Sequence, residues 1–273
     1  MDKFFMKLEK YDVKVYDFSE VVLGEMIGWG GFGEVYKGKV RGKPRALKRL
    51  FFEMNELQGF LSDLLRELVY SKELTSKRFT RIYGISYDKE NNEIYVIMEL
   101  LTCEDLSVYL KKKNLTRNEK REIFDSIVLA LRELQSLNYI HCDLKPENLC
   151  YYNDYKRGEK YIKILDYNLL KKLPSNKQVI VGYNGTYGYS APEQYKNEIC
   201  LKSDNYAIGV IYLEMLLEGD IWGDNFNNYQ KCRKIVLEKL DLVKDDEDYK
   251  ILKGLLSSGY SRRYSLNSLK PDL

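Results

Sequence analysis

The stretch His141-Cys142-Asp143-Leu144-Lys145-Pro146-Glu147-Asn148 places a carboxylate, an ammonium group and a carboxamide on one short segment. Asp143 can accept a proton from an attacking hydroxyl, and Lys145 can neutralise negative charge that develops on phosphoryl oxygens. Asn148 offers an amide oxygen, a hard ligand of the kind that Mg²⁺ prefers. The combination is suited to magnesium-assisted phosphoryl transfer.

A glycine-rich segment, Gly28-Trp29-Gly30-Gly31-Phe32-Gly33-Glu34-Val35, lies much earlier in the chain. Glycines let the backbone approach phosphates closely and expose N–H groups to the anion. The pattern alone also fits a dinucleotide-binding turn or an ordinary hairpin. A dinucleotide-binding turn should open a helix, but residues 34–40 alternate as in a strand. The sequence therefore predicts a hairpin over a nucleotide.

These two segments resemble the glycine-rich loop G-x-G-x-x-G-x-V and the catalytic loop H-R-D-x-x-x-x-N of eukaryotic-type protein kinases. Cys142 stands where the family usually has arginine. Three further matches follow in the family's order. Residues 45–48 (RALK) resemble V-A-I-K, residues 166–168 (DYN) stand in place of Asp-Phe-Gly, and residues 185–193 (GTYGYSAPE) resemble G-T-x-x-Y-x-A-P-E. The resemblance spans about residues 22–270, nearly the whole chain.

The resemblance implies a role for each matched polar residue. Asp143 would orient the acceptor hydroxyl and take its proton, with Lys145 beside it. Lys48 would clamp the α- and β-phosphates of ATP, held by Glu67 on an amphipathic helix at 57–74. Asn148 and Asp166 would bind Mg²⁺. Lys145 and Thr186 resemble the serine/threonine class, so the expected partners are ATP and a protein substrate with a Ser or Thr acceptor.

The resemblance also implies which residues surround the nucleotide. Met98 would be the gatekeeper, and the backbone of Glu99 and Leu101 would hydrogen-bond adenine. Asp105, or equally Glu104, would contact the ribose, and a cysteine would lie beneath the adenine. The full expected set is Ile27, Gly28, Gly30, Gly31, Gly33, Val35, Ala46, Lys48, Met98, Glu99, Leu101, Asp105 and Cys150.

The implied fold is α+β and bilobal, with a small antiparallel β-sheet N-lobe carrying one helix (21–101) and a larger, mainly helical C-lobe (102–273). Residues 1–20 form an N-terminal extension of unknown role. Strands are expected near 22–29, 34–40, 45–51, 81–87 and 93–98. Thr116-Arg117-Asn118-Glu119 predicts a capping box that opens a helix.

Four residues are expected to be structural. His141, the only histidine, should pack beneath the Asp166 turn rather than act as a base. Glu193 resembles the family's partner of Arg263, and Asp204 also falls at a structural position. A buried ion pair of this kind is costly to break from one side, so these positions should govern folding.

Composition limits the remaining possibilities. Of the 273 residues, five are cysteines without C-x-x-C spacing, which favours unpaired thiols and a reducing compartment. With no long apolar run, we expect a cytoplasmic protein that does not bind a membrane. A net charge of +3 is too small to indicate nucleic-acid binding. The sequence leaves the oligomeric state open.

Two alternatives to a protein kinase remain. A nucleotide-binding pseudokinase is suggested by Asn168 in place of glycine and by Ser71, where the family usually has an apolar side chain. A small-molecule kinase of the aminoglycoside-phosphotransferase kind shares a similar catalytic loop. Thr186 and residues 191–193 (APE) speak against it, since in the family they serve a peptide-binding segment.

Overall fold

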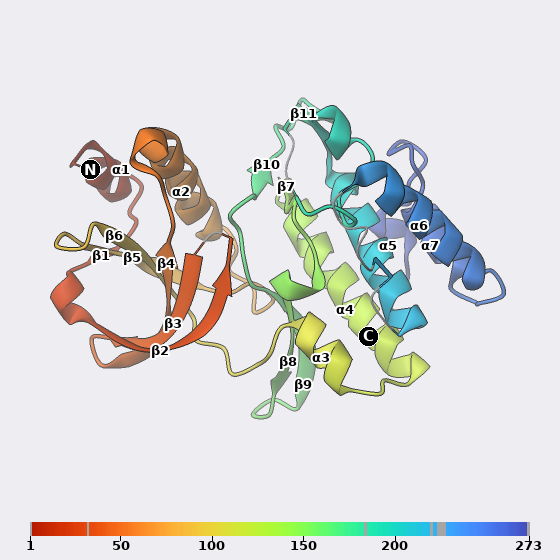
Figure 1. Ribbon diagram of the computed structural model, residues 1–273, viewed down its shortest axis with the longest axis horizontal. Coiled ribbons are helices and arrows are strands. Elements are labelled where there is room, and N and C mark those ends of the chain that lie inside the picture. Colours follow the sequence, from red (N-terminus) through yellow and green to blue (C-terminus); the bar gives the residue numbers. More distant parts are fainter. Residues whose placement is uncertain (1, 32, 183–184, 219–220, 223–227, 272–273) are drawn as a thin grey trace. The chain divides into compact units, whose positions relative to one another are not determined.

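The computed structural model describes residues 2–31, 33–182, 185–218, 221–222 and 228–271 (Figure 1). The chain divides into two compact units, Met1–Thr102 and Cys103–Leu273. The first combines a sheet with two α-helices, and the second is mainly helical among its described residues. The expected α+β fold with an N-terminal sheet and a helical C-terminal part is confirmed.

The first unit is built on a six-stranded sheet of order β1-β5-β6-β4-β3-β2. All neighbours are antiparallel except β1, which pairs with β5 in parallel. Each strand expected from the sequence is present, and β1 is an addition. The strands are β1 (Val15–Tyr16), β2 (Val21–Gly30), β3 (Gly33–Val40), β4 (Lys43–Leu50), β5 (Ile82–Asp88) and β6 (Glu93–Met98).

Two α-helices pack on this sheet. Helix α2 (Leu57–Ser71) is the expected amphipathic helix and ends three residues before the predicted boundary at 74. Helix α1 (Asp2–Lys10) lies beside α2 (Figure 1). Leu64 and Leu68 of α2 share a buried cluster with side chains of β4, β5 and β6. Short 3₁₀ turns occur at Phe18–Glu20 and Met54–Glu56.

The second unit is organised around α5 (Leu201–Leu217), most of whose residues are buried. It lies between α4 (Arg117–Ser136) and the α6–α7 pair, Tyr229–Leu242 and Tyr249–Leu255 (Figure 1). Helix α3 (Leu106–Lys112) opens the unit. Its described residues also form three two-stranded sheets: β7 (Tyr139–Ile140) with β10 (Lys171–Lys172), β8 (Leu149–Asp154) with β9 (Glu159–Ile164), and β11 (Ile180–Val181) with β12 (Glu198–Ile199).

Helix α4 begins as predicted. The Thr116 backbone N–H donates to Glu119 Oε2 over 2.8 Å, and the Glu119 N–H donates to Thr116 Oγ1 over 3.3 Å, which completes the capping box. Its apolar stripe is buried, and its C-terminal end leads directly into β7 and the segment 141–148. The stripe consists of Ile123, Ile127, Leu131 and Leu134.

The predicted ion pair between Glu193 and Arg263 is confirmed and is bidentate. Arg263 Nη1 donates to Glu193 Oε1 over 2.5 Å and Nη2 donates to Oε2 over 2.8 Å. The guanidinium also donates to the carbonyls of Ser257 and Lys202, and its side chain is 0% exposed. Each of the three guanidinium nitrogens thus donates to an oxygen, which compensates for the burial of the charge.

The expectation of five unpaired thiols is wrong, because Cys103 and Cys150 form a disulfide. The segment after Thr102 runs antiparallel to the start of β8, with a backbone bridge between Asp105 and Cys150. The two cysteines are 47 positions apart, so no local spacing could indicate the bond. The cysteine argument for a reducing compartment therefore no longer holds. Cytoplasmic localisation stays a prediction.

Candidate active site

The second unit gathers Asp143, Lys145, Asn148 and Thr186 into one polar cluster. Thr186 Oγ1 donates to Asp143 Oδ1 over 2.6 Å, and Lys145 Nζ donates to Thr186 Oγ1 over 3.0 Å. Lys145 Nζ lies 3.5 Å from Asp143 Oδ2. Asn148 Nδ2 donates to the carbonyl of Asp143 over 2.8 Å and to Oδ2 over 3.2 Å. The family resemblance implies that Thr186 hydrogen-bonds near Asp143 and Lys145, and these distances confirm it.

The backbone of this segment is fixed by Asp204 in the first turn of α5. Its carboxylate accepts from the N–H of His141 over 2.7 Å and from the N–H of Cys142 over 3.0 Å. Cys142 adopts a left-handed backbone with φ of 71°, an uncommon conformation that these bonds help to hold. Burial raises the pKa of Asp204 to about 7, while the two N–H donors act in the opposite direction. These contacts support the structural role expected for Asp204.

His141 is buried and serves as an acceptor inside the segment. Its Nδ1 accepts the backbone N–H of Asp143 over 3.3 Å. Burial lowers the pKa of His141, against the opposing influence of the Asp143 and Asp166 carboxylates. The ring is therefore favoured in its neutral form. These contacts support the structural interpretation and leave Asp143 as the candidate base.

The β8–β9 hairpin brings the two candidate metal ligands to one end. Asn148 directly precedes β8, Asp166 follows β9, and Leu149 pairs with Ile164. The N–H of Leu165 donates to the carbonyl of Asn148 over 3.0 Å. Because the Asn148 amide nitrogen is directed at Asp143, its oxygen is available as a ligand.

The donor set fits Mg²⁺ rather than a metal held by protein alone. Within the described ranges, no three His, Cys, Asp or Glu side chains come together in a way that could hold a metal ion. Mg²⁺ usually takes one or two carboxylates and fills its other positions with waters and substrate phosphates. One carboxylate from Asp166 and one amide oxygen from Asn148 agree with this usual coordination.

Asn168 stands in place of a glycine, the residue that most easily adopts a positive φ. It is absent from the described residues with positive φ. Instead its N–H donates to Asp166 Oδ1 over 3.1 Å and its Nδ2 donates to Oδ2 over 3.0 Å. Asn168 therefore orients the Asp166 carboxylate with its own donors.

The first unit aligns many of the residues expected around the nucleotide on one face of its sheet. Gly28, Val35, Lys48 and Val96 are cross-strand partners over β2, β3, β4 and β6. Residues directly opposite one another point to the same face, and so do residues two apart. Ala46, paired with Met98, therefore joins this face.

Lys48 lies on the face of the sheet that α2 covers, because its partner Val96 belongs to the cluster containing Leu64 and Leu68. Lys48 is 7% exposed and Glu67, on α2, is 8% exposed. A buried ammonium and a buried carboxylate each require compensation. Their burial between sheet and helix agrees with the expected ion pair, which stays a prediction.

The glycine-rich segment forms a hairpin, as expected. Gly30 of β2 pairs with Gly33 of β3, and a Cβ added at Gly30 or Gly31 would meet no atom within 4 Å among the described residues. Gly33 has φ of 152°, and a Cβ there would lie 2.0 Å from the Arg49 carbonyl oxygen. Only glycine fits this position. Ile27 is largely exposed on β2.

Three of the remaining residues that are expected to contact the nucleotide are bonded to other parts of the protein. The Glu99 N–H donates to the Arg81 carbonyl over 2.8 Å, and Leu101 follows on the same connecting segment. Asp105 caps α3, with its Oδ1 accepting from the N–H of Val108 over 3.0 Å. Cys150 is buried within the disulfide. Their roles toward adenine and ribose stay predictions.

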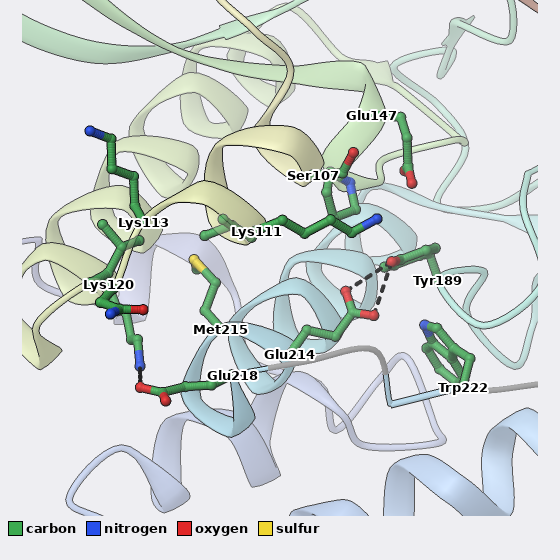
Figure 2. A pocket seen from close by; sticks show the side chains of 14 residues that line it. Ser107, Lys111, Lys113, Lys120, Glu147, Tyr189, Glu214, Met215, Glu218 and Trp222 are labelled. Atoms are coloured by element: carbon green, nitrogen blue, oxygen red, sulfur yellow. Dashed lines mark hydrogen bonds and ion pairs between the residues drawn. The ribbon is translucent and has the colours of Figure 1, made fainter.

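Sequence reasoning missed a pocket of about 620 Å³ beside the segment 141–148, within the second unit (Figure 2). Its lining includes Glu147, Tyr189 and Glu214, and Tyr189 Oη donates to the two Glu214 oxygens over 3.1 and 2.8 Å. Burial raises the pKa of Tyr189. Lys111 extends across the pocket toward Tyr189. These residues come from distant segments, so no spacing could indicate them.

The candidate site thus combines a carboxylate beside an ammonium group and a threonine hydroxyl with a second carboxylate that follows the adjoining hairpin. The family described as "Protein kinase domain" matches residues 21–271. The chain belongs to this family. The eukaryotic-type protein kinase resemblance is thereby confirmed.

Curated relatives agree with this family. The chain is 29% identical over 260 residues to the interferon-induced, double-stranded RNA-activated protein kinase of Rattus norvegicus, covering 89% of this chain and 48% of that protein. It is 28% identical over 257 residues to serine/threonine-protein kinase tousled-like 1 of Mus musculus, covering 87% of this chain and 32% of that protein. The chain thus spans less than half the length of these relatives. None of its described helices is long and apolar enough to cross a membrane.

Proposed function

We propose that this chain is a Mg-ATP-dependent protein kinase that transfers the γ-phosphate of ATP to serine or threonine hydroxyls of protein substrates. The observation that carries the proposal is the cluster of Asp143, Lys145, Asn148 and Thr186. It supplies a proton acceptor and a cation that both bond the Thr186 hydroxyl, together with an asparagine whose amide nitrogen donates to Asp143 and whose oxygen is a candidate metal ligand. The name of the tousled-like relative supports the serine/threonine class.

Each residue of the cluster has a defined task in such a reaction. Asp143 orients the acceptor hydroxyl and takes its proton late, because a loose transition state needs little deprotonation beforehand. Lys145 places positive charge 3.5 Å from that carboxylate, where negative charge on the transferred group would develop. The Thr186 hydroxyl bonds both side chains and so fixes their relative position. Mg²⁺, when bound through Asn148 and Asp166, would neutralise phosphate charge.

Radiolabel transfer from ATP to protein acceptors, comparing wild type with Asp143→Asn, tests the proposal. Asparagine keeps the shape and can still accept from Thr186, but it cannot take a proton. We expect the substitution to reduce transfer at least about 100-fold. Phosphoamino-acid analysis of the labelled acceptor should give phosphoserine and phosphothreonine. Transfer to a small metabolite alone would favour the aminoglycoside-phosphotransferase kind instead.

A nucleotide-binding pseudokinase is the second candidate, and Asn168 is the observation that favours it. Both oxygens of Asp166 accept hydrogen bonds from Asn168, which competes with coordination of a metal ion. Thermal stabilisation by Mg-ATP without phosphoryl transfer would support this candidate. If Asn168 restrains the metal ligand, Asn168→Gly should increase the stabilisation that Mg-ATP provides, and Asn168→Asp should not.

Cytoplasmic localisation and the absence of nucleic-acid and membrane partners belong to the same proposal. They rest on composition and on the modest net charge of +3. Fractionation of cells that express the tagged protein would test the localisation.

A further inference from the structure

Residues 2–16 are integrated into the first unit, although they lie outside the segment 21–271 that the protein kinase family matches. Helix α1 packs on α2, and β1 extends the sheet beyond β5. This N-terminal segment therefore contacts both of the elements between which Glu67 is buried.

Apolar contacts join α1 to α2. Phe4 and Leu8 of α1 are buried in the cluster that contains Leu64 and Leu68 of α2. On a helix, Leu64 lies one turn from both Glu67 and Leu68, so Glu67 lies beside Leu64. Rotation or displacement of α2 would move Glu67 and expose these leucines together.

The end of α1 is shaped so that the chain turns back onto the sheet. The N–H of Val13 donates to the Leu8 carbonyl over 2.8 Å, and the N–H of Asp12 donates to the Glu9 carbonyl over 2.9 Å. Asp12 has φ of 53°, and Val13 and Leu8 are both in the buried cluster. This is the Schellman arrangement with its usual apolar contact.

A single lysine ties the two helix ends together. Lys72, directly after α2, donates through Nζ to the carbonyls of Tyr11 and Asp12 over 3.0 and 2.7 Å. It also bonds the Asp12 carboxylate over 2.9 Å. Its ammonium thus lies near the C-terminal ends of both helices, where positive charge is favourable.

Strand β1 fixes the other end of the segment to the sheet. The Ile85 N–H donates to the Lys14 carbonyl over 2.9 Å, and Ser86 Oγ donates to the Tyr16 carbonyl over 3.0 Å. Gly84 has φ of 146°, and a Cβ there would lie 2.1 Å from the Lys14 oxygen. The close approach of β1 therefore requires glycine at this position of β5.

We propose that residues 2–16 act as a brace that holds α2 in the position where Glu67 can pair with Lys48, with Leu8 and Lys72 as positioning residues. The inference rests on the proposed function, since it gives Glu67 the task of holding Lys48 on ATP. It assigns a role to a segment whose sequence alone indicated none. The brace acts from within the first unit and needs no second protein.

The first test compares two Leu→Ala substitutions, each of which opens a cavity in a different unit. Leu8→Ala opens one beneath α2, and Leu252→Ala opens one on α7 in the second unit, where the leucine is equally buried. With both variants verified as folded by circular dichroism, we expect kcat/KM for ATP to fall roughly tenfold or more for Leu8→Ala. Leu252→Ala should stay within about twofold of wild type, because its cavity does not bear on a positioning contact. Leu8→Met, which fills the volume, should restore activity. Equal losses in the two alanine variants would overturn the proposal.

Lys72→Met provides a second variant in case Leu8→Ala fails to fold, because the Lys72 side chain is 43% exposed. Lys89→Met, at an exposed position after β5, is its control. Hydrogen exchange should become faster in the amides of α2 in Lys72→Met but not in Lys89→Met. This readout needs no catalysis, so it tests the brace even if wild type transfers no phosphate. Unchanged exchange in α2 would refute the brace, whereas an inactive wild type would refute only the proposed function.

Discussion

The two units hold their candidate site residues by different means. In the second unit, the segment 141–148 is fixed by hydrogen bonds to the buried Asp204 carboxylate, and Glu193 and Arg263 form a buried bidentate ion pair. In the first unit, Glu67 lies on a helix that is held mainly by apolar packing. Polar networks depend on each partner and its geometry, whereas apolar contacts tolerate replacement by side chains of similar volume. Substitutions that conserve volume around α2 in the first unit should therefore cost less stability than substitutions in the polar contacts of the second unit.

The largest effect is expected at Arg263. Arg263→Leu leaves the Glu193 carboxylate buried without its partner, which should cost about 3–5 kcal/mol of unfolding free energy. Arg263→Lys should rescue little of it, because lysine cannot form the two parallel bonds. Urea denaturation measures both variants. Near wild-type stability of Arg263→Lys would show that the second unit tolerates substitution after all.

Leu64 in the first unit provides the contrasting case. Leu64→Ala should cost about 2–5 kcal/mol through lost burial and a cavity. Leu64→Met conserves volume and should cost less than about 1.5 kcal/mol. The comparison is made in the same urea experiment. Should methionine prove as damaging as alanine, packing in the first unit would be as strict as the polar network of the second.

A smaller effect on stability, with a clear effect on activity, is expected at Asp204. In Asp204→Asn, the side chain has one oxygen, whereas the N–H groups of His141 and Cys142 each bond a separate oxygen of Asp204. Leaving one N–H unsatisfied should cost about 1–3 kcal/mol. Because the segment would shift, kcat should fall more than KM for ATP rises. Steady-state kinetics on the folded variant measures this, and a change in KM alone would contradict it.

The smallest effect is the pH dependence from His141. Its lowered pKa means that the fold favours the neutral ring, so the stabilisation is present above about pH 6.5 and is lost as pH falls below that value. The loss is at most about 1.4 kcal/mol per pH unit. His141→Asn cannot titrate, and its amide oxygen can replace Nδ1 as an acceptor. The difference in unfolding free energy between wild type and this variant should shrink toward low pH, and a constant difference would argue against a neutral His141.

Motifs with fixed local spacing could be predicted, and contacts between distant segments could not. The capping box at Thr116 and the strands of the first sheet follow from patterns within a few residues. The contact of Thr186 with Asp143 followed from the family resemblance. The disulfide at Cys103, the pocket at Tyr189 and the burial of Leu8 against α2 join segments whose separation carries no local signal. Asn168 could be recognised as a replacement for glycine, but the bond from its side chain to Asp166 follows from no motif.

The disulfide has a consequence for measuring this protein in solution. All five cysteines lie in the second unit, and the three thiols outside the Cys103–Cys150 bond are buried: Cys142, Cys200 and Cys232. A maleimide reagent added without reductant therefore reaches them only when that unit opens. The rate of thiol labelling therefore reports the opening of the second unit alone, because the first unit contains no cysteine.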